Sequence, residues 1–258
     1  MKNQYVGDIG DFGKYGFLKK FCHGLKLGVI WYLTLDEKGR DGKIIQYLNL
    51  DSEEYKSGAR EKNERMFQQC DPKLYDTLRK IVAGNKRDVK EIARRRVLPN
   101  ATYYDSIVLT GAERQAWFAK AIDVVRDCDL VFLDPDNGLA EEGKTFEKRK
   151  SAKHVMLSEV RKLFKRGHSL IIYHHLNRST AGIEQLRFWR KELRGVVGKD
   201  VGIITLWYHR GTARLYFIIP QKKHKKILDA AVREFLQTSW GEKLGHLRTP
   251  HFSRIQQE

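Results

Sequence analysis

An apolar run that stops abruptly at an acid and a proline constrains the fold more than any other segment of this chain. Residues 130–133 are large and apolar, which is typical of a strand buried on both faces of a parallel sheet. The next five residues are Asp134, Pro135, Asp136, Asn137 and Gly138. They cannot continue a strand, because the proline lacks an N–H and the glycine favours a turn. Ligands of open α/β sheets bind just past the carboxyl ends of strands, so this segment is either a site or an ordinary turn.

Strand-like and helix-like segments alternate along the chain. Strands are expected at residues 27–33, 101–108, 130–134, 169–173, 203–208 and 214–220. Amphipathic helices are expected at residues 112–125, 155–166, 180–194 and 222–237. This alternation predicts an α/β fold with a mostly parallel sheet. The short connection at residues 209–212 predicts a C-terminal hairpin that adds an antiparallel strand.

The remaining segments lack strand patterns. Residues 5–20 are rich in glycine and show no helical or strand period, apart from a possible short helix at 17–24, so we expect irregular structure there. Residues 51–98 are charged and mostly helical by pattern, with a helix start at Asp71-Pro72 and a basic helix at 87–98. No linker divides the 258 residues. We therefore expect a single domain, 1–258, with a helical insertion at about 51–98.

The charge balance favours a polyanionic partner. The chain has 49 Lys and Arg against 32 Asp and Glu, a net charge of +17. An excess of this size is typical of proteins that bind nucleic acid, although each basic cluster alone also fits a solvated helix face. The clusters lie at residues 86–96, 161–166, 187–194 and 222–226.

Neither a membrane span nor a secretory signal is expected. The longest apolar runs have strand length, and the N-terminus leads directly into glycines and charges. Cys22, Cys70 and Cys128 are scattered and form no CxxC pair. They indicate reduced thiols in a cytoplasmic protein. The paired His174 and His175 lack further ligands at metal-binding spacing, so no metal site is expected.

Two short motifs resemble those of a known enzyme family. Residues 133–137, Leu-Asp-Pro-Asp-Asn, resemble the Asp-Pro-Pro-Tyr motif of amino-group methyltransferases. Residues 6–15 are similar to the block that opens the ribosomal RNA adenine-N6 methyltransferases, with Gly7, Asp11 and Lys14 matching outright. The expected order of elements is also shared. The resemblance implies a Rossmann-like class I methyltransferase sheet, S-adenosylmethionine as cofactor and an adenine amino group in RNA or DNA as acceptor.

The resemblance implies roles for particular residues. Asp134 and the Pro135 carbonyl would accept hydrogen bonds from the amine, and Lys14 would pair with the methionine carboxylate of the cofactor. The candidate catalytic residues are Asp134, Pro135, Asp136 and Asn137. The candidate cofactor-binding residues are Gly7, Asp11, Lys14, Thr34, Asp36 and Asp105. Tyr173, or Tyr5, would stack on a flipped base. His174, with His175 beside it, would line the same pocket, bind a metal or satisfy hydrogen bonds in the core.

Two departures from the family keep other functions open. The loop at residues 33–40 has one glycine and no acid directly after Leu33, and residues 133–137 lack the second proline and the aromatic. A nucleic-acid-binding protein on a non-catalytic methyltransferase scaffold is one alternative. A metal-dependent nuclease is another, because Pro135-Asp136 followed by Glu142-Gly143-Lys144 spells the PD…ExK pattern.

Overall fold

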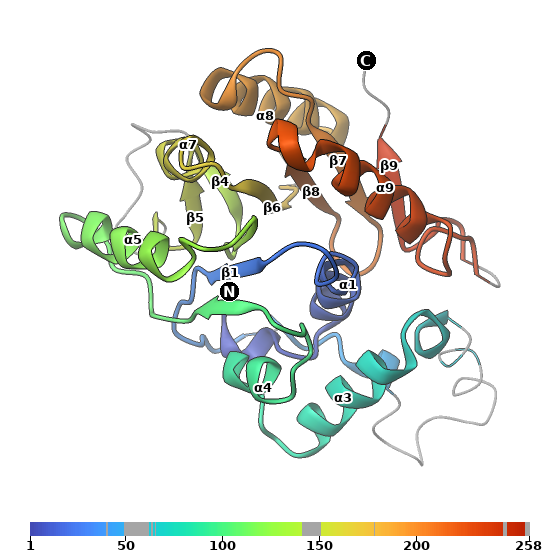
Figure 1. The fold of residues 1–258 in the computed structure, drawn as a ribbon. Coiled ribbons are helices and arrows are strands. Elements are labelled where there is room, and N and C mark those ends of the chain that lie inside the picture. The colour runs from blue at the N-terminus through green and yellow to red at the C-terminus, as the bar shows by residue number, and fades with distance from the viewer. Residues whose placement is uncertain are drawn as a thin grey trace.

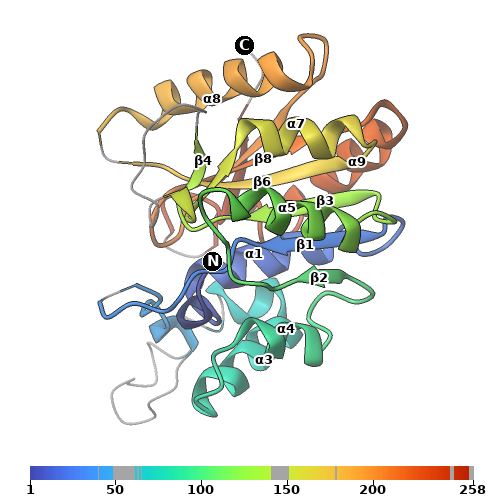
Figure 2. The ribbon, with the colours of Figure 1, turned by 90° about the vertical axis from the view of Figure 1, so that its left-hand side faces the viewer.

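A seven-stranded sheet forms the centre of the molecule (Figures 1 and 2). The computed structural model describes residues 1–39, 41–48, 62, 64, 66–140, 151–177, 179–244 and 247–255. The strands, in spatial order, are β2 (Thr102–Tyr104), β1 (Leu27–Trp31), β3 (Leu130–Asp134), β6 (Ser169–His175), β8 (Arg214–Ile219), β7 (Ile204–Tyr208) and β9 (Phe252–Ile255). A separate short pair joins β4 (Gly138–Ala140) to β5 (His154–Met156).

The sheet is mostly parallel, with antiparallel strands at its C-terminal side. β1 pairs in parallel with both β2 and β3, and β3 pairs in parallel with β6. β8 runs antiparallel to β6 and to β7, so the second strand of the C-terminal hairpin is inserted between them. β9 pairs antiparallel with β7 and forms the sheet edge. The expected α/β class and the reversed C-terminal strand are therefore confirmed.

Helices cover both faces of the sheet and create two cores. One face carries α1 (Ile9–Lys19), α3 (Pro72–Ala83), α4 (Val89–Arg94) and α9 (Lys225–Leu236). The other carries α5 (Glu113–Val124), α7 (Leu157–Lys165) and α8 (Gly182–Val197). Short 3-10 helices lie at Asn3–Tyr5, Gln46–Leu48, Gln68–Cys70 and Lys222–His224. In the described residues, no helix is both long and apolar enough to cross a membrane.

The glycine-rich N-terminal block forms a helix, which corrects the expectation of irregular structure. Asp8 caps α1 by accepting a hydrogen bond from the Gly10 N–H at 2.9 Å. Gly10, Gly13 and Gly16 lie on one side of α1, where side chains would collide with Arg214, Tyr208 and Trp240, respectively. Close packing against the sheet thus outweighs the poor helix propensity of glycine. The same block places Asp11 and Lys14 over the sheet.

The region expected to be a helical insertion contains helices that share the core of the main sheet. α3 begins as expected, with Pro72 at its start and the Asp71 carboxylate accepting from the Leu74 N–H at 3.0 Å. α4 is shorter than the expected 87–98 helix. Buried side chains of both helices pack in the cluster that contains α1. The tail beyond α9, which has no predicted element, contains β9, whose pairing partner β7 lies far away in the sequence.

Candidate active site

A cavity of about 340 Å³ lies at the carboxyl ends of β3 and β6. Its walls come from α1, the segment after β3, the end of β6, the start of β8 and the loop around Gly42. This volume is within the range of small-molecule sites, and the position is where ligands of open α/β sheets bind. The lining carries five aspartates, which are Asp8, Asp11, Asp41, Asp134 and Asp136. Among the described residues, only two lysine or arginine side chains, Lys14 and Arg214, oppose them, so the cavity of this basic protein is acidic.

Lys14 joins the N-terminal block to the end of β3. Its Nζ donates to Asp11 Oδ1 at 2.7 Å and to Asp134 Oδ2 at 2.8 Å, and all three side chains are at most 3 % exposed. Burial alone would lower the pKa of Lys14, but the two carboxylates outweigh that effect and raise it. The lysine therefore stays charged and fixes both acids in place.

Asp11 has one oxygen without a partner in the described part of the chain. This oxygen, Oδ2, is buried and accepts no hydrogen bond there. Burial is the main cause that raises the pKa of Asp11 to about 6, even though Lys14 opposes the shift. An unsatisfied buried carboxylate oxygen is costly, and it is positioned to accept from a cationic or N–H donor in the cavity.

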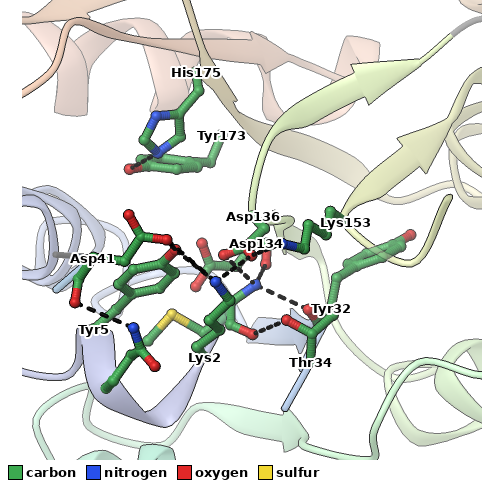
Figure 3. A network of polar contacts seen from close by, with 12 residues as sticks. Lys2, Tyr5, Tyr32, Thr34, Asp41, Asp134, Asp136, Lys153, Tyr173 and His175 are labelled. Atoms are coloured by element: carbon green, nitrogen blue, oxygen red, sulfur yellow. Dashed lines mark hydrogen bonds and ion pairs between the residues drawn. The ribbon is translucent and has the colours of Figure 1, made fainter. Parts of the chain in front are cut away.

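Asp136 belongs to a second polar network, which Figure 3 shows beside Asp134. Its Oδ2 lies 3.5 Å from Lys2 Nζ, and its Oδ1 lies 3.6 Å from the Met1 amino group. Lys2 also contacts Glu37 Oε2 at 2.9 Å and Asp41 at 3.3 Å. Hydrogen bonds from Lys2 and then Lys153 lower the pKa of Glu37 to about 2. This network fastens residues 1–2 over the ends of β1 and β3.

Tyr173 and His175 form an uncharged aromatic wall on the opposite side of the cavity (Figure 3). The Tyr173 hydroxyl lies 3.0 Å from His175 Nε2. Burial, followed by the charge of Arg214, lowers the pKa of His175 well below its usual value, so this imidazole is neutral. Burial raises the pKa of Tyr173 to about 12, so the hydroxyl keeps its proton.

Arg214 closes the cavity from β8 and was not identified from the sequence. The strand register places it opposite His175. Its Nη1 donates to the carbonyls of Arg210 and Thr212 at 2.8 and 2.6 Å, and its Nε is buried without a hydrogen-bond partner among the described residues. No sequence motif marked this arginine, because its position depends on the reversed pairing of β8 with β6. Lys2 was missed as well, since its ion-pair partners Glu37, Asp41 and Asp136 are 35 or more positions away.

The expected site residues do not all meet in this cavity. Asp11, Lys14, Asp134, Pro135, Asp136, Asn137 and Tyr173 all line it. Asn137 is exposed, and its backbone N–H donates to the Lys153 carbonyl at 2.8 Å. His174 faces the other core, where Nδ1 accepts from the Leu139 N–H at 3.0 Å and the ring packs on Trp189. Only its neighbour His175 reaches the cavity.

The other expected cofactor residues lie elsewhere. Gly7 precedes α1 with φ of 84°, and a side chain there would collide with Val82. Asp36 is exposed and accepts from the Gln4 N–H at 3.0 Å, while Asp105 is half-buried just after β2. Thr34 donates its N–H to the Met1 carbonyl at 2.8 Å.

Thr34 also lines a second cavity, of about 340 Å³, past the ends of β1 and β2. Its walls include Ile107 and Val108, together with Glu37 and Lys153 from the Lys2 network. This network therefore separates the acidic cavity from a more apolar one at the same edge of the sheet.

The described residues contain no group of three or more His, Cys, Asp or Glu side chains arranged to hold a metal ion. The Glu142-Gly143-Lys144 half of the possible nuclease pattern lies outside the described residues. Comparisons with protein-family models, with curated proteins and with solved structures found no match to this chain.

Proposed function

We propose that this protein is an S-adenosylmethionine-dependent methyltransferase that acts on an exocyclic amine, with adenine in a nucleic acid as the favoured acceptor. One observation supports this proposal most. The two motifs that carry the family resemblance are 120 positions apart, and they meet at the 2.8 Å contact between Lys14 and Asp134. A helix and a strand end that were unrelated in function would share a buried ion pair at the ligand-binding edge of a sheet only by coincidence.

The strand arrangement adds support. β8 runs opposite to its neighbours and lies between β6 and β7, which is the strand plan that the resemblance to class I methyltransferases implies. A fold alone hosts many activities, so the proposal depends on the cavity rather than on the sheet.

The residues at the carboxyl edge fit the charge of the cofactor. S-adenosylmethionine, when bound, supplies a methyl group on a positively charged sulfur. Asp11 would hold the amino group of its methionine part through the unpartnered Oδ2, and Arg214 would hold the carboxylate through its Nε. The acidic lining of the cavity favours a cation.

Asp134 is the residue that handles the acceptor amine in this proposal. An exocyclic amine is a weak nucleophile because its lone pair is delocalised into the ring. The Asp134 carboxylate and the Pro135 carbonyl would accept hydrogen bonds from the amine hydrogens and thereby orient the nitrogen lone pair. Lys14 keeps the Asp134 carboxylate from rotating, and the uncharged Tyr173 ring offers an aromatic surface for the base.

Calorimetric titration with S-adenosylmethionine and S-adenosylhomocysteine tests the cofactor assignment directly. We expect binding by the native protein and loss of binding in an Asp11→Asn variant and in a Lys14→Ala variant, which removes the cation that holds the Asp11 carboxylate in place. Both variants are checked for folding by circular dichroism. Lys38→Ala is the control, because Lys38 is exposed and outside the cavity. A folded native protein that releases no heat would contradict the proposal.

Transfer of a labelled methyl group to RNA and to DNA tests the role of Asp134. Asp134→Asn is expected to keep the cofactor but to lose about a hundredfold or more of the transfer rate. Asp123→Asn, at an exposed position of α5, is the matched control. Magnesium-dependent cleavage of nucleic acid without transfer would favour the nuclease instead, and salt-sensitive binding without cofactor affinity would favour the non-catalytic scaffold.

A further inference from the structure

A basic groove runs along the outer face of α8, on the far side of the sheet from α1. Figure 2 shows this helix as the outermost layer of the molecule, next to α7. The groove has a volume of about 510 Å³. Its lining includes Arg187, Lys191, Glu192, Arg194, Gly195 and Lys199. Together with the buried Arg190, the lining has five Lys and Arg residues against one acid, which makes this surface the opposite of the acidic cavity.

The cations of the groove form a row at helical spacing. Arg187, Lys191 and Arg194 are related by four and three positions, so they share one face and span about 10 Å along the axis. Across the described ranges, no carboxylate forms an ion pair with Lys191, Arg194 or Lys199. Such cations are available for phosphates, which attract them whatever the nucleotide sequence.

Arg190, on the same helix, shows what a structural arginine looks like here. It is buried, and it donates to Thr205 Oγ1 at 3.1 Å and to the Ile255 carbonyl at 3.2 Å. These bonds attach α8 to β7 and β9. Within the described residues, Lys191 and Lys199 are exposed and make no comparable bond to the sheet, so packing does not explain them.

Phe188 and Gly195 lie one helical turn to either side of Lys191 on α8; Gly195 lines the groove, and Phe188 lies beside its lining residues on the helix. Phe188, three positions earlier, is 40 % exposed and contacts Trp189 edge-on, with ring centroids 5.0 Å apart. An exposed aromatic ring beside cations is the arrangement on which single-stranded bases stack. Gly195, four positions after Lys191, faces the open space of the groove, since a Cβ there would meet nothing within 4 Å among the described residues.

We propose that the α8 groove binds the backbone of single-stranded nucleic acid, with Lys191, Arg194 and Lys199 on phosphates and Phe188 against a base. The inference rests on the proposed function for its purpose, because it assigns where the acceptor strand of the methyltransferase docks. α8 follows β6 and so begins at the sheet edge where the acidic cavity lies. A strand bound along the helix would therefore lead toward that cavity.

Fluorescence anisotropy with a labelled single-stranded RNA oligonucleotide, repeated from about 50 to 200 mM salt, measures this binding. Lys191→Glu/Arg194→Glu is expected to weaken binding about tenfold or more and to reduce the salt slope by about one for each phosphate that is no longer neutralised. Gly195→Glu, which places an acid in the open groove, is expected to weaken binding as well. Gly195→Ala is its matched control and should bind like the native protein.

A second control separates the groove from net charge. Lys223→Glu/Lys226→Glu changes the net charge by the same amount at another basic cluster, around α9, and should leave binding nearly unchanged. Equal weakening by both double variants, or no RNA binding by the native protein, would overturn the inference. Cofactor titration of the groove variants keeps the two proposals distinct. If RNA binding depends on the groove but the protein does not bind the cofactor, the methyltransferase proposal is refuted and the docking-site proposal is retained.

Discussion

The acidic cavity and the α8 groove use the same kinds of side chain in opposite ways. In the cavity, Lys14 is 3 % exposed and has two carboxylates within 2.8 Å. In the groove, Lys191 is exposed and has no carboxylate partner among the described residues. Charges of the first kind are fixed in position and shape a reaction site, whereas charges of the second kind act through a summed, salt-sensitive field. The net charge of +17 sums both kinds and therefore gives no sign that the cavity is acidic.

The largest expected difference between the two regions is in stability. Lys14→Met removes the cation between Asp11 and Asp134 and leaves two buried carboxylates without compensation. We expect it to lower the free energy of unfolding by about 3–5 kcal/mol, measured by urea denaturation. Adding Asp134→Asn to Lys14→Met should recover part of this loss, because one of the stranded charges is removed. A loss below about 1 kcal/mol would mean that water reaches the pair and that the cavity resembles the groove after all.

The protonation of Asp11 should make both the stability of the protein and the cofactor affinity of the acidic cavity depend on pH. Its pKa is about 6 in the folded protein, above the ordinary 3.8, so the folded state binds the proton more tightly than the unfolded chain does. The contribution of Asp11 to stability therefore falls as the pH rises from about 4 to 6. Cofactor affinity should change in the opposite direction, increasing toward pH 6, because only the ionised carboxylate accepts from a cation.

Asp11→Asn is expected to remove both the decrease in stability and the increase in cofactor affinity between about pH 4 and 6. Unfolding and calorimetric titrations over this pH range test them, and parallel changes in stability and affinity would contradict the role given to Asp11.

The smallest effect is expected in the groove. Lys191→Glu/Arg194→Glu should change the free energy of unfolding by no more than about 0.5 kcal/mol, because the two side chains are not packed against the sheet. Urea denaturation of this double variant, carried out alongside the RNA-binding measurement, allows its change in the free energy of unfolding to be compared with that of Lys14→Met. A large decrease in the free energy of unfolding would show that Lys191 and Arg194 have a structural role, like Arg190.

The sequence was sufficient for those parts of the molecule that depend on local pattern. The apolar run before Asp134, the helix start at Asp71-Pro72 and the C-terminal hairpin are all where the patterns placed them. Patterns of this kind report which faces are buried, but they do not report which distant strand lies alongside.

That limit accounts for what was missed. β9 and Arg214 depend on pairing between distant strands, and Lys2 depends on a loop that folds back over it. On β6, the alternation of side chains decides that His175 rather than His174 enters the cavity, and a one-residue change of register would exchange them.

The glycines of α1 have a consequence for how this protein is made. A helix with Gly10, Gly13 and Gly16 has little tendency to form alone, and the side chains it packs against, on Arg214, Tyr208 and Trp240, come about 200 positions later. The glycine face of α1 therefore has no partner until nearly the whole chain has left the ribosome, whereas Phe12 on the same helix contacts Tyr47, Phe67 and Tyr75, which are made early. Because Arg214 also lines the cavity of Asp11 and Lys14, a chain released before β8 carries both motifs without the complete site.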